Sequence, residues 1–236
     1  LILDEVALAE GKEYFRLGQA SISPNGRILA YGYDDNGSER FEVRFRDLES
    51  GELLPDVIPG TLSAIVWNAQ NDAVLYGLAN ENWRTDNVRM HKLGTPIADD
   101  KLLFKEEDIG FSVGIGLTAA DNYIVIGTGD NETSESYLLP ANDITAKTML
   151  VSARKKGREY SVDERDGRLY ILTNDDHANF RVATASIDKP DEWTTFIAGS
   201  DDVYITDLSI FRDYFVLETR EAGLDQVDIR HYDTPL

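Results

Sequence analysis

The stretch SISPNGRILAYGYDD, residues 21–35, joins a polar turn, SPNG, to the short apolar run ILAY at 28–31. A similar run occurs four more times, as AVLY at 73–76, YIVI at 123–126, LYIL at 169–172 and YFVL at 214–217. Successive runs begin 45, 50, 46 and 45 residues apart. A period of this length indicates a repeat architecture in which each unit packs against the next.

A second marker keeps the same period. The strand expected after each apolar run reads EVRFRDL from residue 42, NVRMHKL from 87, ESYLLPA from 135, FRVATAS from 180 and QVDIRHY from 226. These starts are 45, 48, 45 and 46 residues apart. Turn-forming residues separate the runs. Two markers with one period predict five copies of one structural unit.

Each unit has room for four short strands, placed in the first unit at 19–23, 27–34, 41–48 and 52–57. Four antiparallel strands in about 45 residues form the blade of a β-propeller, in which neighbouring sheets pack face to face. Inner strands are then covered on both faces, which agrees with their continuously apolar runs. The predicted fold is an all-β propeller with approximate blades at 19–57, 63–104, 111–151, 158–198 and 203–233.

The two ends of the chain are predicted from the same count. Residues 1–4, LILD, read as the last strand of a preceding blade, and the fifth unit stops before its own fourth strand. We expect an excised arc of a larger ring; the alternative is that LILD closes a five-bladed ring. One short helix or turn is expected within 4–14, where Gly11 interrupts a helix-like spacing of apolar residues.

Composition and charge exclude several classes of function. The 236 residues include 43 acidic and 23 basic side chains, and the formal charge of -20 would repel nucleic acids and anionic membranes. There is no cysteine, which excludes disulfides, thiol nucleophiles and cysteine-bound metals. No apolar run is long enough to span a bilayer, and the first residues do not read as a signal peptide. A cytoplasmic protein is expected.

No catalytic residue is predicted in this chain. A Gly-x-Ser-x-Gly elbow does not occur, and Ser21 and Ser23 lie at a strand end and in a turn. His91, His177 and His231 lie in or beside strands of different blades, without the spacing of a catalytic triad. We interpret them as surface or blade histidines.

Binding motifs in the sequence are weak. GIGLTA, residues 114–119, fits a dinucleotide pattern, but a strand rather than a helix follows it. DDNGSE, residues 34–39, resembles a calcium loop, but Glu39 stands where that loop needs glycine. We therefore predict no metal and no cofactor. The basic cluster ARKKGR, residues 153–158, is interpreted as a solvated loop or a contact patch, and the two rims of the predicted propeller carry similar negative charge.

Three longer stretches resemble a known family: EGKEYFRLGQASISPNGRILAYGYDDNGSERFEVRFRDLESGELLPDVI, RMHKLGTPIADDKLLFKEED and REYSVDERDGRLYILTN. They are similar to the propeller of the oligopeptidase B (protease II) enzymes, within the prolyl oligopeptidase family of serine peptidases. The motifs SPNGRILAY and HKLGT are shared with prolyl oligopeptidase itself. The resemblance runs along essentially the whole chain.

This resemblance implies a parent enzyme that cleaves short peptides after Lys or Arg, in which a seven-bladed propeller caps an α/β-hydrolase domain. The family's catalytic triad lies in the hydrolase domain, so this chain alone is expected to be inactive. The propeller's implied role is to keep folded proteins from the active site and to hold the hydrolase domain. Glu13, and Glu39 or Arg40, match family positions that face that domain and are the candidate interface residues.

Two other functions remain open at this point. The chain could be a stand-alone propeller that serves as a protein-interaction scaffold, or the propeller of a prolyl oligopeptidase-like enzyme with Pro specificity. The expected partners are the hydrolase domain of the same polypeptide and short basic peptides. Dimerisation through the open blade edges, or a non-native closure, is expected to cover those edges in the isolated fragment.

Overall fold

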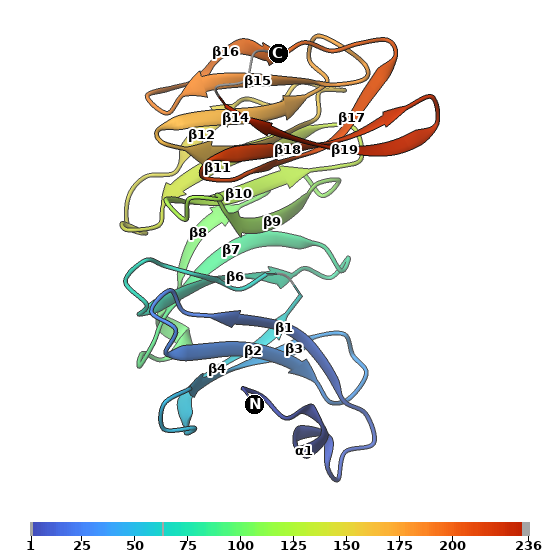
Figure 1. The fold of residues 1–236 in the computed structure, drawn as a ribbon. Helices are drawn as coiled ribbons and strands as arrows, with labels where there is room; N and C mark the ends of the chain where they lie inside the picture. Colours follow the sequence, from blue (N-terminus) through green and yellow to red (C-terminus); the bar gives the residue numbers. More distant parts are fainter. Residues whose placement is uncertain (1, 63, 233–236) are drawn as a thin grey trace. The chain divides into compact units, whose positions relative to one another are not determined.

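The chain is built almost entirely of β-strands (Figure 1). The computed structural model describes residues 2–62 and 64–232 and has nineteen strands there, which confirms the all-β prediction. The one α-helix of this part, α1 (Glu5–Ala9), falls inside the predicted segment 4–14. The chain divides into two compact units, residues 1–116 with 141–144 and residues 117–140 with 145–236.

The first unit contains one eight-stranded antiparallel sheet. Its strands are β1 (Arg16–Ile22), β2 (Ile28–Asp34), β3 (Phe41–Asp47), β4 (Leu53–Thr61), β5 (Val66–Trp67), β6 (Ala73–Ala79), β7 (Thr85–Lys92) and β8 (Lys101–Lys105), with the 3-10 turn η1 (Ile97–Asp99) before β8. The sequence predicted two separate blades here. Because β4 runs past residue 57, its last residue Thr61 pairs with Leu78 of β6 and joins the two four-stranded halves.

The second unit contains sheets whose strands follow one another in the chain. Their strands are β10 (Tyr123–Gly129), β11 (Ser134–Pro140) and β12 (Met149–Ser152); β13 (Tyr160–Arg165), β14 (Arg168–Thr173), β15 (Arg181–Ser186) and β16 (Lys189–Ile197); and β17 (Val203–Ile210), β18 (Tyr214–Glu221) and β19 (Leu224–His231). The sheet of β10 also includes β9 (Ser112–Leu117), in which the boundary between the units falls. The last sheet has three strands within the described residues, as the sequence predicted.

The strand predicted for residues 1–4 is not found in residues 2–4, and residue 1 lies outside the described part of the chain. Asp4 instead caps α1, because its Oδ1 accepts the N–H of Ala7 at 3.1 Å. A strand needs a partner to satisfy its backbone groups. The prediction placed that partner in a preceding blade that this chain does not contain.

The middle strands send alternate side chains to two buried faces. In β14, Leu169 and Ile171 pack against residues of β11 and β12, whereas Tyr170 and Leu172 pack against residues of β17 and β18. All four side chains are buried, and a fully buried leucine or isoleucine contributes about 1.5–3 kcal/mol to stability. Burial on both faces explains why the run LYIL is apolar without alternation.

In each of the first four sequence repeats, a buried polar side chain closes the turn between the first and second strands. Ser23 Oγ accepts the N–H of Ile28 at 2.9 Å, so the serine of the SPNG turn serves the fold. The corresponding position in the next three sequence repeats, five residues before the apolar run, is occupied by Asn68, Thr118 and Glu164. They accept the N–H groups of Ala73, Tyr123 and Gly167 at 3.1, 3.2 and 2.7 Å. All four closing side chains are buried.

Candidate functional site: loops at the sheet ends

The three predicted interface residues lie in the first unit, on segments before β1 or between β2 and β3. Glu13 lies between α1 and β1 and is exposed. Glu39 and Arg40 are neighbours in the β2–β3 loop, where Glu39 Oε1 lies 4.0 Å from Nη1 of Arg16. Two of the three predicted residues are thus neighbours in the chain, and Glu13 belongs to another segment.

The carboxylate of Asp34 holds the β2–β3 loop in its conformation. One oxygen accepts the N–H groups of Asn36 and Gly37, each at 3.0 Å, and the other accepts that of Glu39 at 2.7 Å. Burial alone would raise the pKa of Asp34, but the backbone N–H groups outweigh burial and lower the pKa below 3.8. This carboxylate of the DDNGSE motif therefore faces backbone donors inside the loop.

The β2–β3 loop contacts the β6–β7 loop through Arg40 and Trp83. The guanidinium carbon of Arg40 lies 4.6 Å from the centroid of the Trp83 ring. Trp83 has a backbone φ of +59°, in a region that bulky residues rarely adopt, and it is 51% exposed. The sequence analysis missed Trp83, for which the only signal was a lone aromatic residue in the polar segment NENWR.

His91 of β7 lies in a buried polar network that the sequence analysis also missed. Its Nδ1 lies 2.8 Å from Oδ1 of Asp100, and its Nε2 lies 3.1 Å from Oδ1 of Asp56 in β4. The Tyr76 hydroxyl donates to Asp100 at 2.7 Å, and the N–H of Gly94 donates to Asp56 at 2.6 Å. Burial and the contact with Asp100 raise the pKa of Tyr76 far above its ordinary value. The network ties the two halves of the first sheet together.

The other two histidines make peripheral contacts. His177 Nε2 lies 3.3 Å from Oδ1 of Asp201, and His231 Nδ1 lies 3.2 Å from the backbone oxygen of Asp213. Within residues 2–62 and 64–232, no serine hydroxyl is hydrogen-bonded to a histidine. The described side chains therefore contain no serine nucleophile paired with a histidine base.

The basic cluster 153–158 is smaller at the surface than its sequence suggests. Arg154 pairs with Glu135 at 3.3 Å. Arg158 is buried, with its guanidinium carbon 4.9 Å from the ring centroid of Trp193. Only the lysines at 155–156 combine exposure with a position at the loop tip. Two of the four cations therefore serve the packing of the loop.

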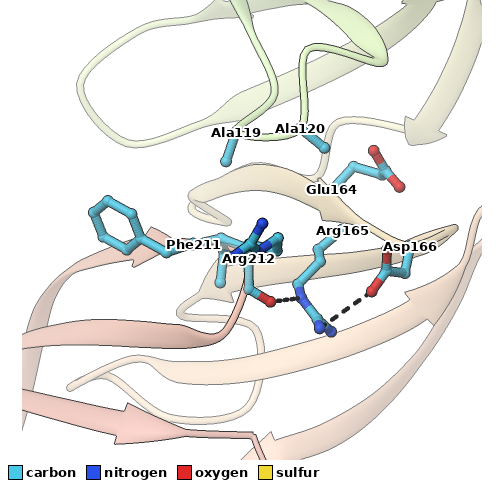
Figure 2. A pocket seen from close by; sticks show the side chains of 8 residues that line it. Ala119, Ala120, Glu164, Arg165, Asp166, Phe211 and Arg212 are labelled. Atoms are coloured by element: carbon cyan, nitrogen blue, oxygen red, sulfur yellow. Dashed lines mark hydrogen bonds and ion pairs between the residues drawn. The ribbon is translucent and has the colours of Figure 1, made fainter.

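A cavity of about 290 Å³ lies among three turns of the second unit (Figure 2). It is lined by Ala119, Ala120, Glu164, Arg165, Asp166, Ile210, Phe211 and Arg212. Arg165 crosses it, donating from Nε to the backbone oxygen of Arg212 at 2.6 Å and pairing with Asp166 at 3.2 Å. Glu164 accepts the side-chain amide of Asn122 at 2.9 Å. These polar groups hold neighbouring turns to one another.

One acid beside this cavity, Asp163, has a raised pKa. Burial raises the pKa of Asp163 above 3.8, although its Oδ1 accepts the N–H groups of Ala119 and Glu164, each at 2.7 Å. The lining residues include no serine, cysteine or histidine. The cavity therefore lacks the groups needed for acyl transfer, and its polar atoms are used in structural contacts.

No three His, Asp or Glu side chains in the described part of the chain are grouped so as to hold a metal ion. None of the helices in residues 2–62 and 64–232 has the length and apolar character needed to cross a membrane.

Comparison with known proteins relates the whole chain to peptidases. Dipeptidyl aminopeptidase BI of Pseudoxanthomonas mexicana is 33% identical over 233 residues, which cover 97% of this chain and 32% of that protein. Protease 2 of Moraxella lacunata is 26% identical over 233 residues, which cover 98% of this chain and 34% of that protein. The chain thus spans about a third of the length of these relatives.

Solved structures agree with the sequence comparison. Oligopeptidase B from Leishmania major superposes with a TM-score of 0.94 at 27% identity, covering 99% of this chain and 33% of that one. Oligopeptidase B from Trypanosoma brucei, in a closed form with covalently bound antipain, gives a TM-score of 0.91 at 30% identity, covering 98% of this chain and 33% of that one. The predicted propeller fold is confirmed by these matches. Because the family "Prolyl oligopeptidase, N-terminal beta-propeller domain" matches residues 1–235, the chain belongs to that family of propeller domains.

Proposed function

We propose that this chain is the non-catalytic propeller of an oligopeptidase B-like serine peptidase, which cleaves oligopeptides after Lys or Arg in the cytoplasm. The observation that carries the proposal is the likeness to oligopeptidase B of Leishmania major, with a TM-score of 0.94 over 99% of the chain. The blades of this chain would form an arc of a longer, seven-bladed ring. The catalytic serine, aspartate and histidine would lie in a separate hydrolase domain.

In this proposal the propeller selects substrates by size. Sheets packed on both faces resist deformation, so a ring of them admits a thin, extended peptide and excludes a folded protein. The chain has 43 acidic and 23 basic side chains, and the resulting net charge of -20 favours the approach of basic peptides. Glu13, Glu39 and Arg40 would face the hydrolase domain, and a short basic peptide would be the substrate of the complete enzyme.

The test uses the full-length polypeptide and a series of peptides of increasing length, each with a single Lys, Arg or Pro. We expect cleavage after Lys and Arg, with turnover that falls steeply as the peptide lengthens. The chain 1–236 alone should cleave none of them. Equal turnover of short peptides and folded proteins would contradict the filtering role, and cleavage only after Pro would favour the prolyl oligopeptidase-like alternative.

A second candidate activity is the release of dipeptides from free amino termini. It is favoured by the 33% identity with a protein named dipeptidyl aminopeptidase BI. Matched peptides with a free or a blocked amino terminus separate the two activities. If turnover requires the free amine, this second candidate replaces internal cleavage after Lys or Arg. A stand-alone scaffold would instead give no turnover and no labelling by a serine-reactive fluorophosphonate.

A further inference from the structure

Trp83 is placed in a way that the packing of the propeller does not require. Its backbone φ of +59° lies in the left-handed region, where a side chain crowds the following carbonyl group and glycine or asparagine is favoured. The residue is nevertheless a tryptophan, and it is 51% exposed. By contrast, Trp67 is 2% exposed and packs in the core of the first unit. Glu39 and Phe180 also have a left-handed φ, in the β2–β3 and β14–β15 loops, so it is the exposure of the large tryptophan side chain that points to a role outside the fold.

The β6–β7 loop holds this conformation firmly. Oδ1 of Asn80 accepts the N–H groups of Asn82 and Arg84 at 2.9 and 3.2 Å, and the N–H of Trp83 donates to the backbone oxygen of Asn80 at 3.2 Å. Arg84 also donates from Nη1 to the backbone oxygen of Gly110, on the segment between β8 and β9. The ring of Trp83 is therefore presented by a closed loop that is braced on both sides.

Arg40 fixes the ring from the neighbouring loop. Its guanidinium carbon lies 4.6 Å from the ring centroid, within the range of a cation–π contact. Arg40 is itself half-buried, next to Glu39 and its partner Arg16. Ile109, beside Gly110, is 77% exposed and adds apolar surface on the adjoining segment. We call Arg40, Trp83 and Ile109 the rim patch. Tryptophan and arginine, with tyrosine, are enriched among the residues that contribute most to binding at protein interfaces.

We propose that Trp83 is the anchor through which the rim patch docks on the second domain of the full-length polypeptide, and that Arg40 is its positioning residue. The inference rests on the proposed function for the existence of that domain. A second domain is the partner that we expect on the rim patch, because this chain covers only 33% of each oligopeptidase B chain that it resembles. We expect this partner also because Arg40 belongs to both the predicted interface and the rim patch. The docking contact adds an aromatic anchor to the charged residues that the sequence singled out.

The test follows the solvent exposure of Trp83 in the full-length polypeptide and in residues 1–236 alone. Both proteins are labelled with 5-fluorotryptophan, and Trp83→Phe assigns the fluorine resonance. We expect a soluble gadolinium chelate to broaden this resonance in the isolated chain and to leave it sharp in the full-length protein. Equal broadening in the two proteins would overturn the proposal. Protection of the isolated chain that grows with its concentration would identify a second copy as the occupant and would also overturn it.

Two substitutions test the roles separately. Trp83→Gly suits the left-handed backbone, so the isolated chain should keep its unfolding temperature, while hydrogen exchange at residues 35–40 and 80–84 of the full-length protein should become faster. Phe211→Ala removes an exposed aromatic residue from a different turn and should leave that exchange unchanged. Arg40→Gln should shift the Trp83 fluorine resonance in the isolated chain, with Arg40→Lys partly restoring it. Unchanged exchange with Trp83→Gly contradicts the anchor, and an unchanged resonance with Arg40→Gln contradicts the positioning role.

The docking contact and the proposed activity fail in different ways. Cleavage after Lys and Arg together with an exposed Trp83 would overturn only the anchor. A protected Trp83 in a full-length protein without peptidase activity would uphold the anchor and reject the proposed function.

Discussion

His91 combines almost complete burial with two acidic partners, and this makes it the most sensitive single residue of the first unit. Each ring nitrogen lies within hydrogen-bond distance of a carboxyl oxygen. The ring lies between Asp56 and Asp100, whose side chains are 4% and 1% exposed. Phe45 stacks on the imidazole at 6.1 Å and keeps water from that face. The two buried carboxyl groups therefore share His91 as a polar partner.

Replacing His91 by alanine should destabilise the chain by about 3–5 kcal/mol, because it leaves two buried carboxylates without their shared partner. Urea denaturation of residues 1–236 measures the loss. His231→Ala removes an exposed imidazole from β19 and serves as the control, for which we expect a change close to zero. A loss with His91→Ala no larger than that of the control would show that the network contributes little.

The sequence indicated His91 only through the HKLGT motif that it shares with prolyl oligopeptidase. Its acidic partners lie 35 and 9 residues away, and no local spacing marks them as partners. The pairing depends on where β4 ends relative to β7, which is a matter of sheet geometry. Trp83 escaped prediction for a related reason, since exposure and backbone φ cannot be read from a loop sequence. Glu39 and Arg40 were singled out because the family resemblance supplied their positions, and their role at an interface stays a prediction.

At the scale of the element, carboxylates organise the loops between strands. Asp47, at the end of β3, accepts the N–H groups of Ser50 and Glu49 at 3.0 and 2.9 Å and pairs with Arg27 at 2.9 Å. The hydrogen bond from Ser50, followed by the contact with Arg27, lowers the pKa of Asp47 from 3.8 to about 2. A lowered pKa means that the folded state favours the ionised carboxylate, which stabilises the turn near neutral pH.

This contribution should disappear in acid. It is complete above the unfolded pKa of 3.8 and is lost as the pH falls through the folded value of about 2. Asp47→Asn keeps an acceptor in the turn but cannot titrate, so its stability should fall less steeply than that of the unsubstituted chain over this pH window. The measurement is the urea midpoint as a function of pH. Asp191→Asn, on the exposed part of β16, is the matched control, and a wild-type slope for Asp47→Asn would refute the prediction.

Strand positions were predictable because apolar runs and turn residues mark them, whereas strand ends were less so. The second strand of the first unit was predicted at 27–34 and lies at Ile28–Asp34. The fourth was predicted at 52–57, but β4 continues to Thr61, where the hydroxyl donates to the backbone oxygen of Phe41 at 3.2 Å. Residues beyond 57 carry no strand signal of their own, and their conformation depends on the tertiary partner in β6.

At the scale of the whole molecule, the last sheet differs from the sheets before it. In β18, Phe215 and Leu217 pack against the preceding sheet. Val216 points to the opposite face, where it pairs with Ile229 of β19. Ile229 and its neighbour Val227 on that face are 64% and 68% exposed. Two large apolar side chains thus lie uncovered on an edge strand, β19, of the last sheet.

This surface should make residues 1–236 self-associate in isolation. We expect sedimentation velocity to show a weight-average mass that rises with concentration, because burying Val227 and Ile229 between copies removes apolar surface from water. The double substitution Val227→Lys with Ile229→Lys should give a monomer. Val6→Lys, in the exposed helix α1, is the control and should change nothing. A concentration-independent monomer for the unsubstituted chain would contradict the expectation.

Five apolar runs at one period predicted five sets of strands; within the described residues, the first two sets are joined in one eight-stranded sheet, and three separate sheets follow. What covers the last sheet was not predictable in the same way. The sequence offered an arc of a larger ring, a five-bladed ring or a dimer, and its pattern does not distinguish among them. Composition and periodicity predict the strands of each repeat. They do not predict the angle between successive sheets, which determines how many repeats close a ring.

The four turn-closing side chains have a consequence for how such a domain can change. Ser23, Asn68, Thr118 and Glu164 have different volumes and chemistry, yet each supplies a side-chain oxygen that accepts at least one backbone N–H of the turn. This position therefore requires a buried side-chain acceptor oxygen rather than one particular amino acid. Copies of a duplicated segment can exchange a hydroxyl, an amide and a carboxylate there without losing the turn. Sequence identity between the repeats therefore understates how similar their turns are, and a turn from one repeat should be tolerated in another.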